Sequence, residues 1–205
     1  MAIIYNPNKR IFTLHTKHST YQMQVDSLGY LLHLYYGAKN NSSMEYVLTY
    51  ADRGFSGNPY AAGADRTYSL DALPQEFPTL GTGDYRNIAL DIKNSRGIES
   101  TNLLYKKHEI RKGKYALPGL PAVWADEAEA QTLEIVLADE NAGMEVHLLY
   151  GVLEEVDVIT RSAVIRNIGT ETVTIEKAAA ACLDFVSGNY DVIRFYGKHA
   201  FERNV

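Results

Sequence analysis

Hydrophobic and polar residues alternate with a period of two in a series of short segments along the chain. This alternation is typical of half-buried strands in an antiparallel sheet, whose side chains point to opposite faces in turn. Turn-forming residues separate the segments about every ten positions, which is the spacing found in β-sandwiches. No helix of ordinary length is indicated. The predicted strands are 11–15, 20–25, 30–36, 87–93, 102–112, 115–117, 132–138, 144–150, 158–167, 173–177 and 179–184.

Two of these predictions depend on weaker signals. Lys112-Gly-Lys114 predicts a tight turn that joins strands 102–112 and 115–117 as a hairpin. The alanine-rich run 178–181 also suits a helix, but its β-type flanks favour a strand over 179–184. No linker, repeat or low-complexity tract divides the sequence. We therefore expect one all-β domain over residues 1–205, a large antiparallel β-sandwich that is truncated before its end.

Composition and charge indicate an ordinary globular protein without disulfides. The 205 residues are 46% hydrophobic and 22% charged, and the single cysteine, Cys182, is expected to be a buried structural thiol. The net charge of −5 argues against nucleic acid as a partner. One basic cluster is predicted to be the solvated face and turn of a hairpin: Lys106, Lys107, Arg111, Lys112 and Lys114.

The sequence also lacks signals for export or membrane insertion. Its beginning has no hydrophobic signal-peptide region, and no apolar run approaches the ~20 residues of a membrane span. We expect a cytoplasmic protein with no membrane partner.

The residues that could carry chemistry form no motif sufficient for catalysis. The six histidines have no zinc-binding spacing and are expected to be strand or surface residues, and Gly81-Thr-Gly83 is too short for a phosphate-binding loop. Carboxylate pairs can hydrolyse glycosides, but the sequence alone places no two carboxylates at the required separation. The candidates are Asp52, Asp65, Glu76, Asp84 and Asp91. No metal or cofactor site is predicted.

Residues 50–86 differ from the rest of the chain. Turn formers, charged residues and aromatics follow one another there with almost no periodic apolar pattern. Long ordered loops in compact domains are usually functional. This segment is therefore the first place to look for a binding site.

Several motifs, in this order and spacing, resemble the N-terminal domain of the family 36 α-galactosidases. Those that carry the resemblance include Asp52-Arg-Gly-Phe-Ser-Gly-Asn-Pro59, Ser69-Leu-Asp-Ala-Leu-Pro-Gln-Glu-Phe-Pro78, Gly81-Thr-Gly-Asp-Tyr-Arg86, Leu117-Pro-Gly-Leu-Pro-Ala122 and Gly197-Lys-His-Ala-Phe-Glu-Arg-Asn204. Each motif alone is weak, and it is their order that makes the match specific. The resemblance covers nearly the whole chain.

The resemblance implies a galactose-mutarotase-like supersandwich that packs against a catalytic (β/α)₈ barrel. Members are retaining exo-α-galactosidases that act on melibiose, raffinose and related α-1,6-galactosides, without a cofactor. The barrel supplies the nucleophile from a Lys-Trp-Asp motif, whereas the only tryptophan here, Trp124, lies in Val-Trp-Ala. The resemblance thus implies no catalytic residue in this chain, an inactive isolated chain, and a homo-oligomer, a tetramer, in the parent enzyme.

Two residues of the loop match positions that contact substrate in the family. Asp52 and Arg66 resemble these positions, and the family's loop reaches the sugar pocket, in some members from a neighbouring subunit. The alternative is that both residues brace the loop through Asx-turn bonds and an ion pair. Two other functions also remain open, namely a free-standing carbohydrate-binding module and a purely structural oligomerisation domain.

The end of the sequence is predicted to expose apolar side chains. Val192, Ile193, Phe195, Tyr196 and Phe201 are separated by few charges, and we expect them to promote self-association.

Overall fold

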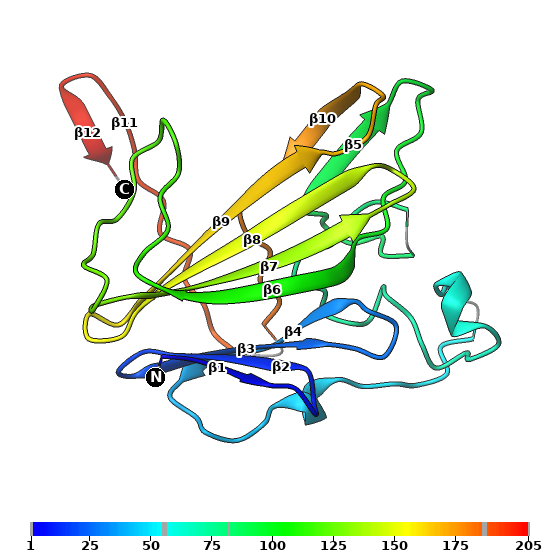
Figure 1. The fold of residues 1–205 in the computed structure, drawn as a ribbon, viewed down its shortest axis with the longest axis horizontal. Coiled ribbons are helices and arrows are strands. Elements are labelled where there is room, and N and C mark those ends of the chain that lie inside the picture. Colours follow the sequence, from blue (N-terminus) through cyan, green and yellow to red (C-terminus); the bar gives the residue numbers. More distant parts are fainter. Residues whose placement is uncertain (1, 55–56, 82, 186–187, 205) are drawn as a thin grey trace.

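The computed structural model describes residues 2–54, 57–81, 83–185 and 188–204, and consists almost entirely of antiparallel sheets (Figure 1). The first four-stranded sheet has the order β1 (Ile3–Asn6), β2 (Ile11–His15), β3 (Ser19–Val25), β4 (Leu31–Ala38). The second has the order β6 (Leu104–Lys112), β7 (Gln131–Asp139), β8 (Met144–Leu153), β9 (Val158–Asn167). Two smaller sheets pair β5 (Leu90–Asn94) with β10 (Val173–Ala178) and β11 (Tyr196–Lys198) with β12 (Phe201–Asn204).

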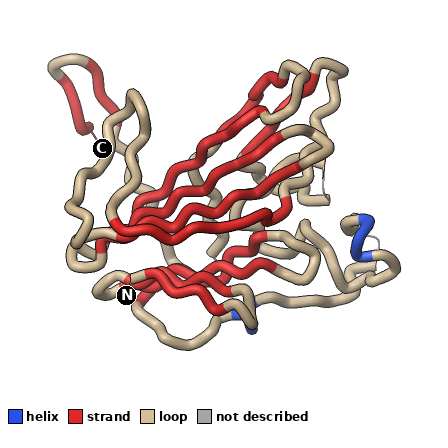
Figure 2. Tube along the Cα trace, in the orientation of Figure 1, coloured by secondary structure: helices blue, strands red, loops and turns tan. Residues whose placement is uncertain are grey.

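Helix is almost absent from the described residues. The structure has two 3₁₀ turns of three residues each, η1 (Glu45–Val47) and η2 (Tyr60–Ala62). Figure 2 shows the rest of the chain as strands joined by loops, several of them long. The expected all-β class is confirmed.

The two large sheets pack face to face around one hydrophobic core. Their inner faces meet in a single cluster because alternate residues of each strand point inward. Fully buried members from the first sheet include Phe12, Leu14 and Met23, and from the second Leu133, Ile135, Leu148 and Tyr150. The register between β7 and β8 places Leu133 opposite Tyr150 and Ile135 opposite Leu148, so large side chains share the inner face.

Most predicted strands are present, and two have the predicted bounds. Strands 11–15 and 158–167 coincide with β2 and β9, and the others that are found differ from their predicted bounds by a few residues. Strands β1, β11 and β12 had not been predicted. All three are short, with three or four residues each, so they carry too few positions for alternation to be recognised.

The predicted hairpin at Lys112-Gly-Lys114 is wrong. Strand β6 pairs instead with β7, Lys112 opposite Gln131, and the Gly113 N–H donates to the Ala130 carbonyl oxygen at 2.8 Å. Gly113 has φ +80°, which lets the chain leave the sheet there and return at Gln131. The glycine marks the start of a long excursion and not a two-residue turn.

Four of the five residues of the basic cluster accordingly belong to an edge strand, and Lys114 lies beyond its end. Lys106, Lys107 and Lys112 of β6 are exposed, as expected, although the turn assigned to the cluster does not exist. Lys106 Nζ lies 2.9 Å from Glu145 Oε1. Charged side chains on an edge strand discourage pairing with other chains.

The predicted strand 179–184 is also wrong. The Ala179 N–H donates to Ala89 O at 2.8 Å and continues the β5–β10 pairing by one bond, after which the chain is irregular. Ala180 and Ala181 are exposed. Small exposed side chains provide little burial to hold a strand in a sheet.

The apolar residues near the C-terminal end are exposed, as the sequence predicts. Val192 is 87% exposed, and Ile193, Phe195, Tyr196 and Phe201 are each more than half exposed. No helix in the described part of the chain is long and apolar enough to cross a membrane.

Candidate functional site

The 50–86 loop has an exposed part and a buried part. Residues 50–54 and 57–67 are mostly exposed, and we call them the outer limb; residues 68–79 are mostly buried, and we call them the inner limb. Figure 1 shows η2 of the outer limb projecting away from the sandwich. Phe55, Ser56 and Thr82 of the loop motifs lie outside the described residues.

A small second core holds the inner limb on the first sheet. Leu70 and Leu73 are fully buried in one cluster with Leu32 of β4. The Tyr68 hydroxyl donates to the Asp26 carboxylate in the turn between β3 and β4. Burial, followed by this carboxylate, raises the pKa of Tyr68, so the hydroxyl remains a donor. The apolar residues of the loop are few, but they are concentrated in the inner limb, where they attach the loop to the first sheet.

An arginine closes the far end of the loop. Arg86 binds the buried Asp84 carboxylate with two nitrogens, Nε to Oδ1 at 3.0 Å and Nη2 to Oδ2 at 2.8 Å. The same guanidinium donates to the carbonyl oxygens of Leu70 and Leu73. Gln75 Nε2 also donates to Asp84 Oδ2, at 2.9 Å. These bonds fix the end of the 50–86 loop to its inner limb.

Glu76 fastens the inner limb to both sheets of the sandwich. Its side chain is fully buried and accepts hydrogen bonds from Tyr21 (2.6 Å) of the first sheet and Tyr150 (2.7 Å) of the second. His33 Nδ1 lies 3.1 Å from one carboxylate oxygen, and Arg161 Nη1 lies 3.0 Å from the other. Arg161 also donates to the Glu76 carbonyl oxygen at 2.8 Å.

The charges around Glu76 decide its protonation state. Burial would raise the pKa of the Glu76 carboxyl, but the Arg161 guanidinium and the His33 contact outweigh it, so the pKa lies below its ordinary value. The carboxylate is therefore ionised and shielded from solvent. It anchors the loop and cannot exchange protons with a ligand at the surface.

Asp52 and Arg66, the two residues predicted to contact substrate, are brought together on the outer limb. Arg66 Nη2 lies 3.3 Å from Asp52 Oδ1, and the same oxygen accepts the Gly54 N–H at 2.8 Å. These are the Asx-turn bond and the ion pair expected of bracing residues. The side chains remain 52% and 66% exposed, so the pair also presents acceptor and donor atoms to solvent.

A cleft also opens on the 50–86 loop. It has a volume of about 540 Å³, and the nearby Asn58 Nδ2 donates to the Asp65 carbonyl oxygen at 3.0 Å. Tyr60 and Tyr85, two highly exposed aromatic residues, line it. The remaining lining residues are Leu28, Tyr30, Gly57, Asn58, Pro59, Ala61, Gly81, Gly83, Asn102 and Leu104. The sequence had not indicated this cleft, because its walls come from four separate parts of the chain.

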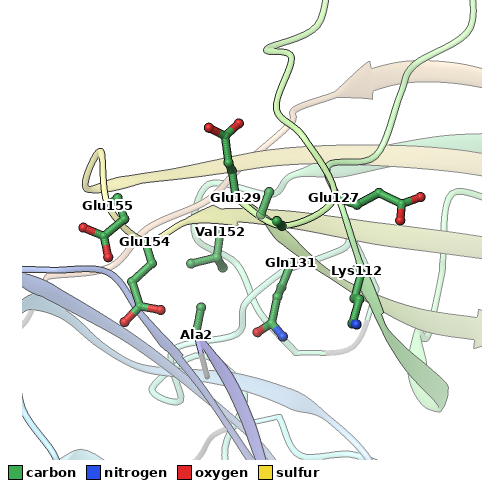
Figure 3. A pocket seen from close by; sticks show the side chains of 10 residues that line it. Ala2, Lys112, Glu127, Glu129, Gln131, Val152, Glu154 and Glu155 are labelled. Carbon is green, nitrogen blue, oxygen red and sulfur yellow. The ribbon is translucent and has the colours of Figure 1, made fainter.

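A second hollow of about 500 Å³ lies next to Ala2, which directly precedes β1 (Figure 3). Its rim carries four carboxylates and one ammonium group, from Glu127, Glu129, Glu154, Glu155 and Lys112. Within the ranges that the structure describes, no three His, Cys, Asp or Glu side chains gather closely enough to hold a metal ion.

The histidines in the strands have partners within the protein. His15 contacts Thr20 at 2.8 Å, His147 contacts Glu134 at 2.7 Å, and His108 packs on the Phe12 ring. Their interpretation as strand residues is consistent with these contacts.

Cys182 is half-buried at the margin of the core, and so it is less enclosed than the sequence suggested. Burial raises the pKa of its thiol, which disfavours the nucleophilic thiolate.

Comparisons with known proteins agree over almost the whole chain. A family model described as the glycosyl hydrolase family 36 N-terminal domain matches residues 29–205. The bifunctional α-galactosidase/sucrose kinase AgaSK of Mediterraneibacter gnavus is 81% identical over 100% of this chain and 22% of that protein. The solved galactosidase domain of AgaSK matches with a TM-score of 0.94 and 81% identity, over 99% of this chain and 28% of that one.

A more distant solved relative carries a ligand. It is a variant of the family 36 α-galactosidase AgaA from Geobacillus stearothermophilus, in complex with raffinose. It is 42% identical, with a TM-score of 0.79, over 83% of this chain and 24% of that one. The chain thus spans about a quarter of the length of these relatives.

Proposed function

The chain belongs to the glycosyl hydrolase family 36 N-terminal domain family, and from this premise we propose that it is the non-catalytic N-terminal domain of an α-galactosidase. The domain supports a catalytic barrel elsewhere in the parent protein and contributes the 50–86 loop to the substrate pocket. The relatives that cover the chain are α-galactosidases, which supports this role.

The carboxylates of the chain favour a supporting role over a catalytic one. Retaining glycosidases need two carboxyl groups about 5 Å apart that face the same sugar. Glu76 and Asp84 are buried, and each is already paired, Glu76 with Arg161 and Asp84 with Arg86. In this proposal the nucleophile and the acid/base group belong to the barrel, and the isolated chain is inactive.

The exposed Asp52–Arg66 pair is the single observation that carries the proposed substrate contact. Sugar hydroxyls both donate and accept hydrogen bonds, and this pair offers a carboxylate acceptor beside a guanidinium donor. Glu76 joins the inner limb to both sheets, and Arg86 binds the inner limb from the end of the loop. A loop held in this way, with exposed charged groups on its outer limb, suits a role in a neighbouring pocket.

The finer features of the proposal come from the family resemblance. The parent enzyme cleaves terminal α-1,6-linked galactose from melibiose- and raffinose-type oligosaccharides with retention of configuration. It assembles as a homo-oligomer, a tetramer, and works in the cytoplasm. The raffinose complex of AgaA supports the choice of substrate class.

A comparison of two proteins tests the location of the chemistry. The full-length protein and the 205-residue chain are each purified and assayed with α-galactosyl fluoride. We expect turnover by the full-length protein and none above buffer by the chain, because both catalytic carboxylates would be missing. Turnover by the purified chain, or an inactive full-length protein, would overturn the proposal.

A further inference from the structure

Two aromatic rings flank the cleft on the 50–86 loop without being used to hold the fold. Tyr60 of η2 is fully exposed, and Tyr85 is 81% exposed. Both rings are therefore free to contact a ligand in the cleft, and an aromatic ring provides a large apolar surface for such a contact. Aromatic faces also stack on the C–H face of a pyranose ring.

The polar groups of the cleft suit an uncharged ligand. None of the described residues that line it is Asp, Glu, Lys or Arg. Asn58 and Asn102 provide amide groups, and each is oriented by one internal bond, Asn58 to the Asp65 carbonyl and Asn102 to the Tyr30 hydroxyl at 2.9 Å. Fixed amides between aromatic walls recognise hydroxyl groups, whereas a phosphate or an acidic peptide would require cations.

Bare backbone forms one wall of the cleft. Gly57 and Gly83 lie against each other so closely that a Cβ on Gly83 would meet the Gly57 carbonyl oxygen at 3.2 Å. Gly83 also has φ +93°, which other residues rarely adopt. A wall without side chains leaves room for a sugar ring to approach the two tyrosines.

The cleft and the proposed galactose contacts belong to one piece of the loop. Asn58 lines the cleft and donates to the carbonyl oxygen of Asp65, and the next residue is Arg66 of the Asp52–Arg66 pair. A saccharide whose terminal galactose meets Asp52 and Arg66 can therefore extend its following rings along the same loop.

We propose that the Tyr60–Tyr85 cleft binds the sugar rings that follow the terminal galactose of a neutral oligosaccharide. This inference rests on the proposed function, because it needs the 50–86 loop to reach the substrate pocket. The cleft would then discriminate by substrate length. It contributes to the binding of tri- and tetrasaccharides, but it has no role with α-galactosyl fluoride, whose leaving group is a single atom.

The test compares Tyr60→Ala and Tyr85→Ala in the full-length protein with raffinose, stachyose and α-galactosyl fluoride. We expect KM for raffinose and stachyose to rise about 3- to 10-fold in each variant, as for the loss of one aromatic contact. The KM for α-galactosyl fluoride should stay within about twofold of the wild-type value. Tyr46→Ala is the matched control, since Tyr46 is 71% exposed but lies outside the cleft, and it should change nothing.

A binding measurement supplies a readout other than turnover. Saturation-transfer NMR on the wild-type protein with sucrose, the part of raffinose that follows the galactose and contains no galactosyl bond, should mark its glucose and fructose protons, and the Tyr60→Ala/Tyr85→Ala double variant should lose that signal. Retention of the signal by the double variant would overturn the cleft proposal.

Failure of the cleft and failure of the proposed galactose contacts are distinguishable. If Asp52→Ala slows every substrate while the tyrosine variants match Tyr46→Ala, the cleft proposal is wrong and the pair retains its role. If only the tyrosine variants raise KM, and only for raffinose and stachyose, the cleft proposal is supported and the proposed role of the Asp52–Arg66 pair is wrong. An equal loss with α-galactosyl fluoride, or a changed oligomer mass in the tyrosine variants, would also overturn the cleft, since the rings would then serve folding or assembly.

Discussion

Glu76 and Arg161 form an ion pair inside the sandwich, with Arg161 Nη1 3.0 Å from Oε1 of a fully buried carboxylate. Glu76 comes from the loop and Arg161 from β9, so the pair joins the inner limb to the second sheet. Tyr21 and His33 complete the connection to the first sheet. The loop that carries the candidate site is therefore built into the core and not laid on the surface.

Glu76→Gln should strongly destabilise the fold. The substitution leaves the Arg161 guanidinium, which is only 10% exposed, without a counter-charge, and breaking a buried pair in this way costs about 3–5 kcal/mol. Urea unfolding followed by circular dichroism measures the loss. Glu45→Gln is the control, because the Lys9–Glu45 pair is exposed and should contribute little. Equal midpoints for the two variants would show that the buried pair does not hold the fold together.

The same carboxylate should make stability depend on acid pH. Because the pKa of Glu76 is lower in the folded state than its ordinary value of 4.5, its contribution is complete above about pH 4.5 and is lost as pH falls through the lower folded value. The stability difference between the wild type and Glu76→Gln should therefore shrink from pH 5 toward pH 3. Chemical unfolding of both proteins over this pH range measures the difference, and a difference that grew as the pH fell would contradict the predicted direction.

Tyr68→Phe should loosen the loop at its attachment to the β3–β4 turn. The change removes the hydroxyl that donates to the buried Asp26 carboxylate, at a cost of about 1–3 kcal/mol. Hydrogen exchange should then increase in residues 65–73 more than in β7 or β8. Tyr46→Phe on the exposed η1 turn is the control. Unchanged exchange in residues 65–73 would mean that the apolar contacts of Leu70 and Leu73 suffice.

The exposed apolar residues near the C-terminal end should promote association of the chain. Val192 and Ile193 are 87% and 67% exposed and adjacent, and Phe195 follows at 65%. Light scattering of the 205-residue chain should show a mass that rises with concentration, and Val192→Lys/Ile193→Lys should reduce it. Val123→Lys, at a half-exposed position on another loop, is the control. A monodisperse monomer at all concentrations would contradict the prediction.

The sequence predicted strands well where clear turns bound them. Strand 158–167 was found with its predicted bounds, between the turn 154–157 and the bend at Gly169. At Lys112-Gly-Lys114 the local turn signal was misleading, since the true partner of β6 begins at Gln131. Local sequence cannot report which of two later strands will pair.

The site was predictable in part. The loop was recognisable from its composition, and Asp52 and Arg66 are indeed adjacent in space. The contacts that anchor the loop could not be predicted, because Glu76 accepts hydrogen bonds from Tyr21 and Tyr150, which lie 55 and 74 residues away in the sequence. The cleft was hidden for the same reason, since Tyr60 and Tyr85 face it across the loop. Contacts between residues so far apart in the sequence arise from the fold and leave no local sequence pattern.

The most direct test of the central claim is a double-variant cycle at Asp52 and Arg66 in the full-length protein. Asp52→Ala, Arg66→Ala and the double variant are assayed with α-galactosyl fluoride and raffinose, with Arg53→Ala as the exposed control on the same loop. If both residues contact the sugar, each loses a charged hydrogen bond of about 1.5–3 kcal/mol, so kcat/KM falls about 10- to 150-fold. The double variant should fall further, and the unfolding midpoint should stay near that of the wild type, because exposed ion pairs contribute little to stability. If all three variants match Arg53→Ala on both substrates, the pair does no more than brace the loop, and the claim that this domain contributes to the substrate pocket through them is wrong.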